Sequence, residues 1–175
     1  ESNIRIPLQT LGDLRSNLAA LRIGEKGVVA LVERYGADLL SRYFAELIDY
    51  TERLVRAEIR SWPDGEYSFT DYLDDDGVDA GEIPIKVTMR VAGDSLVVDF
   101  TGTSPQRPGC INSPRAVTVS ACFYAVRCVV GEQAPANQGC LRPVNSITPP
   151  GSLINPGPQR GAVPYTHLTS PMNGR

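Results

Sequence analysis

The stretch that decides the fold is Ile83-Pro84-Ile85-Lys86-Val87-Thr88-Met89-Arg90-Val91, then Ala92-Gly93-Asp94, then Ser95-Leu96-Val97-Val98-Asp99-Phe100. Two β-rich runs that flank a short turn containing Gly predict a β-hairpin. Apolar residues alternate in the first run, so one face of the hairpin is expected to be buried. The sequence therefore predicts an antiparallel sheet at the centre of the chain.

The segment before the hairpin predicts one further strand and an acidic turn. Trp62-Pro63-Asp64-Gly65 is a turn signal, and the strand-like residues that follow it are Tyr67, Phe69, Tyr72 and Leu73. Asp74-Asp75-Asp76-Gly77 comes next, without the spaced Asp/Asn positions and terminal Glu of a calcium loop. We therefore favour a solvated turn over a metal site.

The first third of the chain predicts a helical layer. Thr10 is a plausible N-cap, and Leu11, Leu14, Leu18 and Leu21 recur at steps of three and four residues. Gly24 and Gly27 interrupt this pattern, which predicts a second short helix at 28–35 that ends at Gly36 and a third helix at 37–60.

Downstream of the hairpin, two loops rich in Gly and Pro flank one apolar segment. The loops cover residues 101–114 and 135–143; residues 115–130 predict a helix, and its scarcity of charge predicts burial. A strand is expected at 144–148. The predicted fold class is α+β: an N-terminal helical layer, an antiparallel hairpin sheet and a buried helix between Gly/Pro-rich loops, incomplete in isolation.

Composition excludes several classes of function. The 175 residues suit one domain, and 42% hydrophobic and 21% charged residues are ordinary for a globular protein. The formal net charge of -3 gives no positive electrostatic field that would attract nucleic acid. No stretch of apolar residues is long enough to predict a membrane span, and the N-terminal residues lack the pattern of a signal peptide. A cytoplasmic location is expected. The chain begins with Glu1 rather than Met, which suggests a start further upstream.

No complete catalytic constellation is visible. His167 is the sole histidine, and neither a nucleophile elbow nor a Walker phosphate loop is present. Thr101-Gly102-Thr103 resembles a phosphate-binding turn, but a sharp strand exit is the favoured interpretation. The four cysteines are spaced too widely for a zinc knuckle; free thiols are favoured, and disulfides remain an alternative.

Three loop residues are candidates for contact with a substrate or a partner surface: Asn112, Asn137 and Arg142. An Asn before Ser-Pro, as at Asn112, or ahead of Gly, as at Asn137, is also ordinary turn chemistry, so a structural role remains open for each candidate.

Four segments in the second half of the chain carry a family resemblance. They are 98–106 (VDFTGTSPQ), 109–118 (GCINSPRAVT), 137–143 (NQGCLRP) and 150–156 (PGSLINP). In this order they resemble the hydantoinase B/oxoprolinase family. The helical first third is also similar to the family's upstream segment, so the resemblance covers residues 1–162.

This resemblance implies an ATP-dependent hydrolase of cyclic amides, of the N-methylhydantoinase or 5-oxoprolinase type. In the family a companion, hydantoinase A-type subunit or domain binds ATP and phosphorylates the substrate oxygen, which makes an unreactive amide open to attack by water. The resemblance thus implies a hetero-oligomer that uses ATP, Mg and a divalent metal. The family's metal motifs lie outside this segment, so no cofactor, metal ligand or catalytic residue is assigned to it.

Two alternatives and one departure from the family accompany this interpretation. Ketone carboxylation by the same family is one alternative, and a non-catalytic assembly module is the other. After Gly161 the family pattern is lost, and residues 163–175 are interpreted as an atypical tail left by a truncation or a shifted reading frame. The domain prediction is therefore a central family segment at 1–162, followed by this tail.

Overall fold

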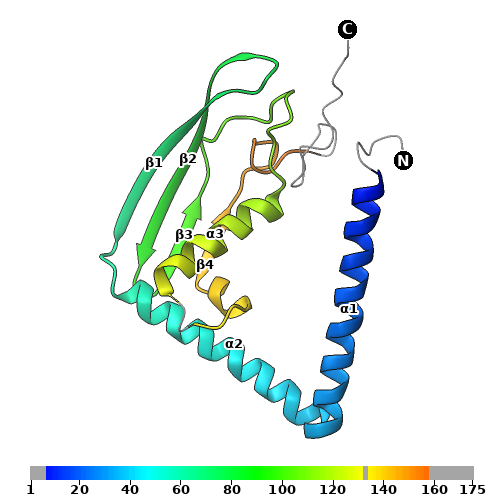
Figure 1. Cartoon of the computed structure of the whole chain (residues 1–175). Helices are drawn as coiled ribbons and strands as arrows, with labels where there is room; N and C mark the ends of the chain where they lie inside the picture. The colour runs from blue at the N-terminus through cyan, green and yellow to red at the C-terminus, as the bar shows by residue number, and fades with distance from the viewer. Residues whose placement is uncertain (1–6, 132–133, 158–175) are drawn as a thin grey trace. The chain divides into compact units, whose positions relative to one another are not determined.

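A computed structural model describes residues 7–131 and 134–157, which fall into two compact units divided between residues 46 and 47. The elements, in order, are α1 (Pro7–Tyr35), α2 (Ala37–Arg60), β1 (Gly65–Asp75), β2 (Ala80–Ala92), β3 (Ser95–Asp99), α3 (Arg115–Val130), the 3-10 helix η1 (Gln138–Leu141) and β4 (Val144–Ile147) (Figure 1). Helices and strands together confirm the predicted α+β class.

Helix α1 is one continuous helix, so the predicted breaks at Gly24 and Gly27 are wrong. Thr10 lies inside the helix rather than at its N-cap, because the helix already begins at Pro7. A glycine inside a helix costs only about 1 kcal/mol relative to alanine, which the good helix formers around it offset. Gly36 does end the helix as predicted: it has a φ of 81°, and its N–H donates to the Val32 carbonyl at 2.8 Å.

Replacing Gly24 or Gly27 with alanine is expected to stabilise α1 by about 1 kcal/mol per site. A Cβ at either position meets no atom within 4 Å, so no steric cost opposes the gain. Helicity measured by circular dichroism should rise. Gly36→Ala is the control and should act in the opposite direction, because its positive φ strains any side chain. A loss of helicity in both interior variants would contradict this account.

The second unit is built on a four-stranded sheet with the strand order β1-β2-β3-β4. The predicted hairpin is confirmed as β2 and β3, which pair antiparallel from Thr88↔Asp99 to Ala92↔Ser95. Strand β1 adds to β2 antiparallel, but β4 pairs with β3 in parallel. The sheet is therefore mixed rather than antiparallel, because the chain crosses over through α3 before it returns to β3.

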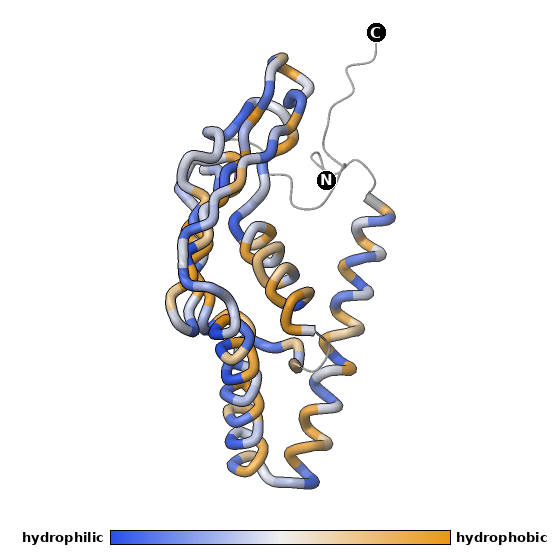
Figure 2. Tube along the Cα trace, turned by 90° about the vertical axis from the view of Figure 1, so that its left-hand side faces the viewer, coloured by the Kyte–Doolittle hydropathy of each residue, from blue (hydrophilic) through white to orange (hydrophobic). Residues whose placement is uncertain are grey.

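Helix α3 has the predicted bounds, but it is buried on one face only. Thr118, Cys122 and Val126, spaced four residues apart, are buried, whereas Tyr124 is 71% exposed. The colouring of Figure 2 shows hydrophobic residues along most of the length of this helix. The prediction of full burial is wrong for the described structure, because the sheet covers a single face.

One hydrophobic core joins the sheet to both helices that reach it. The second half of α2 contributes Val55 and Ile59, each 0% exposed, and α3 contributes Cys122 and Val126. The remaining buried members come from β2, β3, η1 and β4: Val91, Leu96, Val98, Cys140 and Val144. This core fixes the second half of α2 across one end of the sheet, where the charged residues described next are gathered.

Candidate functional site

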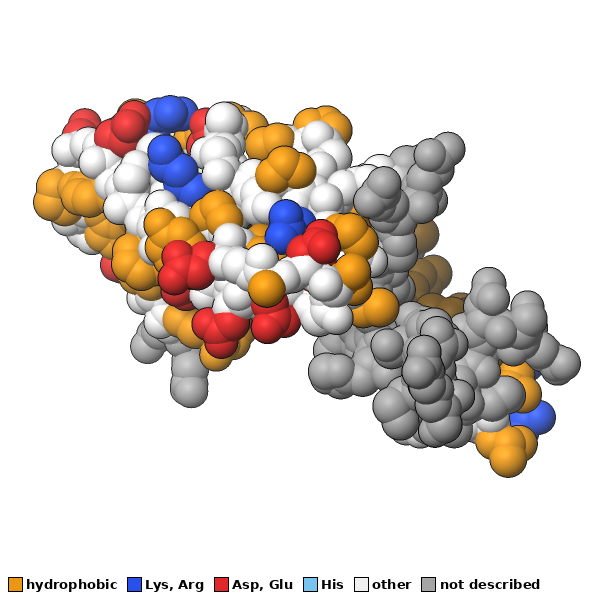
Figure 3. All heavy atoms as spheres, turned by 90° about the horizontal axis from the view of Figure 1, so that it is seen from above, with side chains coloured by type: hydrophobic (Ala, Val, Ile, Leu, Met, Phe, Trp, Pro, Cys, Tyr) orange, Lys and Arg blue, Asp and Glu red, His pale blue; other side chains and the backbone are white. Residues whose placement is uncertain are grey.

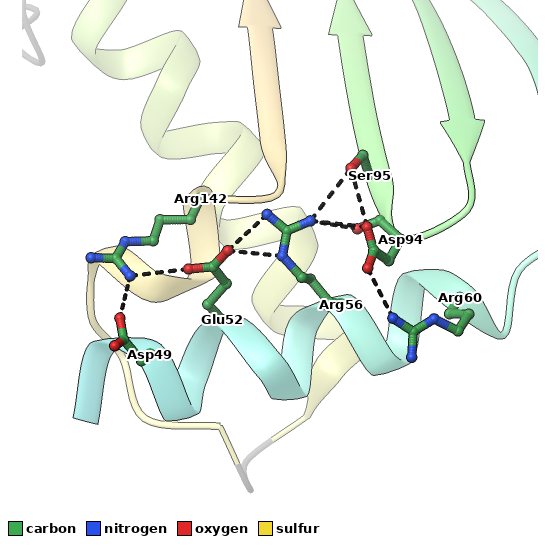
Figure 4. Close-up of polar contacts among 7 residues, drawn as sticks. All are labelled: Asp49, Glu52, Arg56, Arg60, Asp94, Ser95 and Arg142. Carbon is green, nitrogen blue, oxygen red and sulfur yellow. Dashed lines mark hydrogen bonds and ion pairs between the residues drawn. The ribbon is translucent and has the colours of Figure 1, made fainter. Parts of the chain in front are cut away.

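A chain of ion pairs joins α2 to the β2–β3 turn and to the residue after η1 (Figure 4). Glu52 is central: its Oε1 accepts from Arg56 at 2.7–2.8 Å, and its Oε2 accepts from Arg142 Nη1 at 3.0 Å. Arg142 also pairs with Asp49. At the other end, Asp94 accepts from Arg56 at 3.0 Å and from Arg60 at 2.9 Å.

Two of these carboxylates, Glu52 and Asp94, are held in their charged form by their arginine partners. Hydrogen bonds from Arg56 and then Arg142 lower the pKa of Glu52. The hydrogen bond from Arg60, with the nearby charge of Arg56, lowers the pKa of Asp94. Because the side chains are partly exposed, each pair contributes little stability alone, but the network fixes the direction of the η1 segment against α2.

Asn137 links the η1 segment to α2 through side-chain hydrogen bonds. Its side-chain oxygen accepts from the Gly139 N–H at 2.8 Å and so caps η1, while its Nδ2 donates to Thr51 Oγ1 at 2.8 Å. The close approach also depends on Gly139, because a Cβ there would meet the Ile48 carbonyl oxygen. Asn137 and Arg142 thus both contact the same stretch of α2: Asn137 bonds to Thr51, 86 positions away, and Arg142 to Asp49, 93 positions away.

Asn112 lies in a separate loop and organises it. The residue is 2% exposed; its side-chain oxygen accepts from the Arg107 N–H at 2.8 Å, and its Nδ2 donates to the carbonyls of Arg107 at 2.7 Å and Gly109 at 3.2 Å. Both polar atoms of the Asn112 side chain therefore have partners within the loop. Contact of Asn112, Asn137 or Arg142 with a substrate or partner stays a prediction.

Asp76 is a buried carboxylate that sequence reasoning missed. Only 5% exposed, it accepts from the N–H groups of Val78 at 2.9 Å, Asp79 at 2.6 Å and Gly109 at 3.2 Å. The solvated turn was therefore the wrong prediction for Asp76, although Asp74 and Asp75 are exposed. The spacing Asp76-Gly77-Val78-Asp79 is typical of an Asx turn and was the available signal.

Asp76 also has a basic neighbour. Arg107 Nε lies 3.7 Å from Asp76 Oδ2 and is buried without a hydrogen-bond partner in the described ranges. The carboxylate thus joins the acidic turn to the loop that Asn112 organises.

Stability is expected to fall with acidification through Asp76. The backbone N–H of Asp79 foremost, with those of Val78 and Gly109 and the charge of Arg107, lowers the pKa of this carboxyl group. A folded-state pKa below the unfolded value of about 3.9 gives stability that is present above that value and lost as the pH falls through the folded pKa.

Urea unfolding between pH 2 and 6 measures this contribution. Asp76→Asn should flatten the acid limb of the stability profile, whereas Asp74→Asn, at an exposed neighbour, should leave it unchanged. Identical limbs in wild type and Asp76→Asn would contradict the assignment.

The turn at 101–103 is a strand exit held by its own hydrogen bonds. The Asp99 carboxylate accepts from the Thr101 N–H at 2.9 Å, and Thr103 Oγ1 both accepts from the Lys86 N–H and donates to the Lys86 carbonyl. Gly102 has a φ of 96°, which favours glycine. These bonds confirm the strand-exit interpretation.

An apolar groove of about 440 Å³ lies between the sheet and α3. Its lining is entirely hydrophobic: Trp62, Val87, Met89, Leu96, Val98, Phe100, Ala121, Cys122, Ala125, Val126 and Val129. Trp62 is the one lining residue with a side-chain N–H donor, and this group already donates to Glu58 Oε1 at 3.1 Å, so the groove is poorly suited to orient a cyclic amide.

The cysteines, possible metal ligands and the histidine are the remaining candidates from the sequence. All four cysteines are free, with Cys122 and Cys140 buried. In the described part of the chain, no group of His, Cys, Asp and Glu has the arrangement of a metal site, and no helix is long and apolar enough to cross a membrane. His167 lies outside the described residues. One face of the molecule shows basic, acidic and hydrophobic side chains interspersed rather than a field of one sign (Figure 3).

Comparison with known proteins identifies a family. The family model described as hydantoinase B/oxoprolinase matches residues 1–172, which includes part of the predicted atypical tail. A putative B-type D-/L-hydantoinase subunit from Pseudomonas sp. is 38% identical over 169 residues, which cover 89% of this chain and 28% of that protein. A 5-oxoprolinase from Saccharomyces cerevisiae is 32% identical over 164 residues, which cover 91% of this chain and 12% of that protein.

Solved structures agree with the sequence comparison. The crystal structure of an ATP-dependent caprolactamase from Pseudomonas jessenii matches with a TM-score of 0.79 and 32% identity, covering 88% of this chain and 27% of that one. An acetone carboxylase structure matches with a TM-score of 0.77 and 18% identity, covering 86% of this chain and 22% of that one. At this identity the match supports only the similarity of fold. The chain therefore spans under a third of the length of these relatives.

Proposed function

Because the chain belongs to the hydantoinase B/oxoprolinase family, we propose that it is a segment of a subunit of an ATP-dependent enzyme that hydrolyses a cyclic amide. The observation that carries the proposal is the chemistry shared by the names of its relatives. Hydantoinase, 5-oxoprolinase and caprolactamase each name a ring that contains an amide bond, and these relatives are 32–38% identical to the chain.

ATP is proposed to bind to a companion subunit or domain of the A type. This placement is supported by the turn at 101–103, the one stretch that resembles a phosphate loop, because its polar groups hold its own strand exit. A divalent metal and Mg are likewise assigned to parts of the enzyme outside this segment. Two relatives, the hydantoinase and the caprolactamase, are named as single subunits of their enzymes, which supports a hetero-oligomer.

The contribution of this segment is proposed to be positional. Asn112 and Asn137 have their polar atoms bonded within the chain, so they act by holding the two Gly-rich loops in place. Arg142 is 47% exposed despite its ion pairs, which makes it the candidate best placed to contact a substrate or a companion surface. A purely non-catalytic assembly module is the competing hypothesis.

A panel of substrates tests the proposed reaction. The full-length subunit, co-expressed with its companion, is supplied with ATP and with hydantoin, 5-oxoproline or caprolactam, and ring-opened product is measured by mass spectrometry. We expect opening of at least one ring. Carboxylation of acetone in the presence of bicarbonate, with no ring opened, would instead favour the ketone carboxylase alternative.

Arg142→Ala is expected to reduce turnover by about tenfold while the complex still assembles, because a positioning contact of a charged group is worth roughly 1.5 kcal/mol. Arg60→Ala is the matched control, since Arg60 belongs to the same ion-pair network at 66% exposure but lies at its far end. Size-exclusion chromatography reports assembly. Loss of assembly would support the assembly-module hypothesis, and equal turnover in wild type and both variants would remove Arg142 from the proposal.

A further inference from the structure

Helix α1 carries a seam with the spacing of a coiled coil. Steps of three and four residues alternate along Leu11, Leu14, Leu18, Leu21, Glu25, Val28, Val32 and Tyr35, which we call the α1 seam. Its seven apolar or aromatic members are each between 36% and 69% exposed. The seam runs for about 36 Å at 1.5 Å per residue. A heptad pattern of this length predicts that a second helix packs along it.

The polar residues at the seam show what kind of helix fits. Arg15 follows Leu14 and Arg22 follows Leu21. If the seam residues are the a and d positions of a heptad, these two arginines lie at e positions, beside the contact between paired helices. Glu25 occupies a core position of the seam itself. A fitting partner therefore has an apolar stripe, acidic side chains facing Arg15 and Arg22, and a basic group opposite Glu25.

A second copy of α1 does not meet this requirement. A parallel pair would bury Glu25 against its own copy, which leaves two like charges in a core layer. An antiparallel pair brings the e positions of the two helices together, so that Arg22 would face an arginine. Charge complementarity thus selects a different helix.

We propose that the α1 seam is covered by another helix of the same full-length subunit. This inference rests on the proposed function, in which the chain is a segment of a longer polypeptide. The chain spans 28% of the hydantoinase relative, so most of such a subunit lies beyond these residues. A stripe of this length, apolar or aromatic at every seam position except Glu25, is typical of a permanent contact rather than a transient one.

Amide hydrogen exchange on the full-length subunit, purified without its companion, tests the proposal. The α1 amides should be protected in wild type, and Leu18→Asp should lower their protection about tenfold or more, because it buries an unpaired charge. Ile23→Asp is the matched control: Ile23 is 72% exposed on the same helix but lies on the face opposite the seam. The α1 amides of Ile23→Asp should be as protected as those of wild type.

A second pair of variants tests the charges. Arg22→Glu should lower α1 protection about threefold through repulsion by an acidic partner, whereas Lys26→Glu, outside the seam and its flanks, should not. Three results would overturn the proposal: protection that needs the companion, protection that rises with protein concentration, or equal losses in Leu18→Asp and Ile23→Asp. Exchange is measured without turnover, so a protein that opens no ring still tests the seam.

Discussion

Gly139→Ala is expected to lower the free energy of unfolding of the second unit by about 3 kcal/mol or more. The added Cβ would clash with the Ile48 carbonyl oxygen and lie 2.8 Å from Thr51 Cβ and 2.9 Å from Asn137 Oδ1. The nearest of these atoms belongs to the backbone of α2, which the core holds in place, so the η1 segment must move away. The contact between Asn137 and Thr51 would be lost with it.

Urea unfolding followed by tryptophan fluorescence measures this effect, since Trp62 is the sole tryptophan and packs against the core. Gly157→Ala is the control in the same unit, because a Cβ there comes no closer than 3.6 Å to Gln106 Oε1. Equal midpoints for the two variants would show that η1 does not pack on α2 as described.

Asn112→Asp is expected to have the second largest effect, about 3 kcal/mol. The exchange keeps the shape of the side chain but replaces the Nδ2 donor, which serves the carbonyls of Arg107 and Gly109, with a carboxylate oxygen that repels them. Burial at 2% exposure prevents water from relieving this repulsion.

The pH dependence of the same variant separates charge from shape. A protonated carboxyl group can donate one hydrogen bond, so the deficit of Asn112→Asp relative to wild type should shrink on acidification. Asn145→Asp, at an exposed strand position, should cost less than 0.5 kcal/mol at any pH, roughly as for other surface substitutions. A deficit that does not change with pH would contradict the role of the two carbonyl contacts.

Features written locally in the sequence were predictable. The hairpin around Gly93, the end of α1 at Gly36 and the bounds of α2 and α3 follow from short periods and turn residues. The continuity of α1 was not predictable from the sequence. A glycine signals a break only when the surrounding helix formers fail to offset its cost.

Features that depend on distant residues escaped prediction. The parallel pairing of β4 with β3 joins segments 48 positions apart, as in Leu96↔Val144. The same limit applies to the candidate site: sequence placed Asn137 and Arg142 in a loop, but their α2 partners became visible only in the structure. Burial of Asp76 likewise depends on Gly109, 33 residues away.

We propose that this chain works within an enzyme that couples ATP to the opening of a cyclic amide. The most direct test is to follow ADP and ring-opened product together in the full-length complex, with ATP or the companion subunit omitted in turn. We expect the two products to form in a fixed ratio, and ring opening to be lost when either ATP or the companion subunit is omitted. Ring opening that proceeds at the same rate without ATP would contradict it.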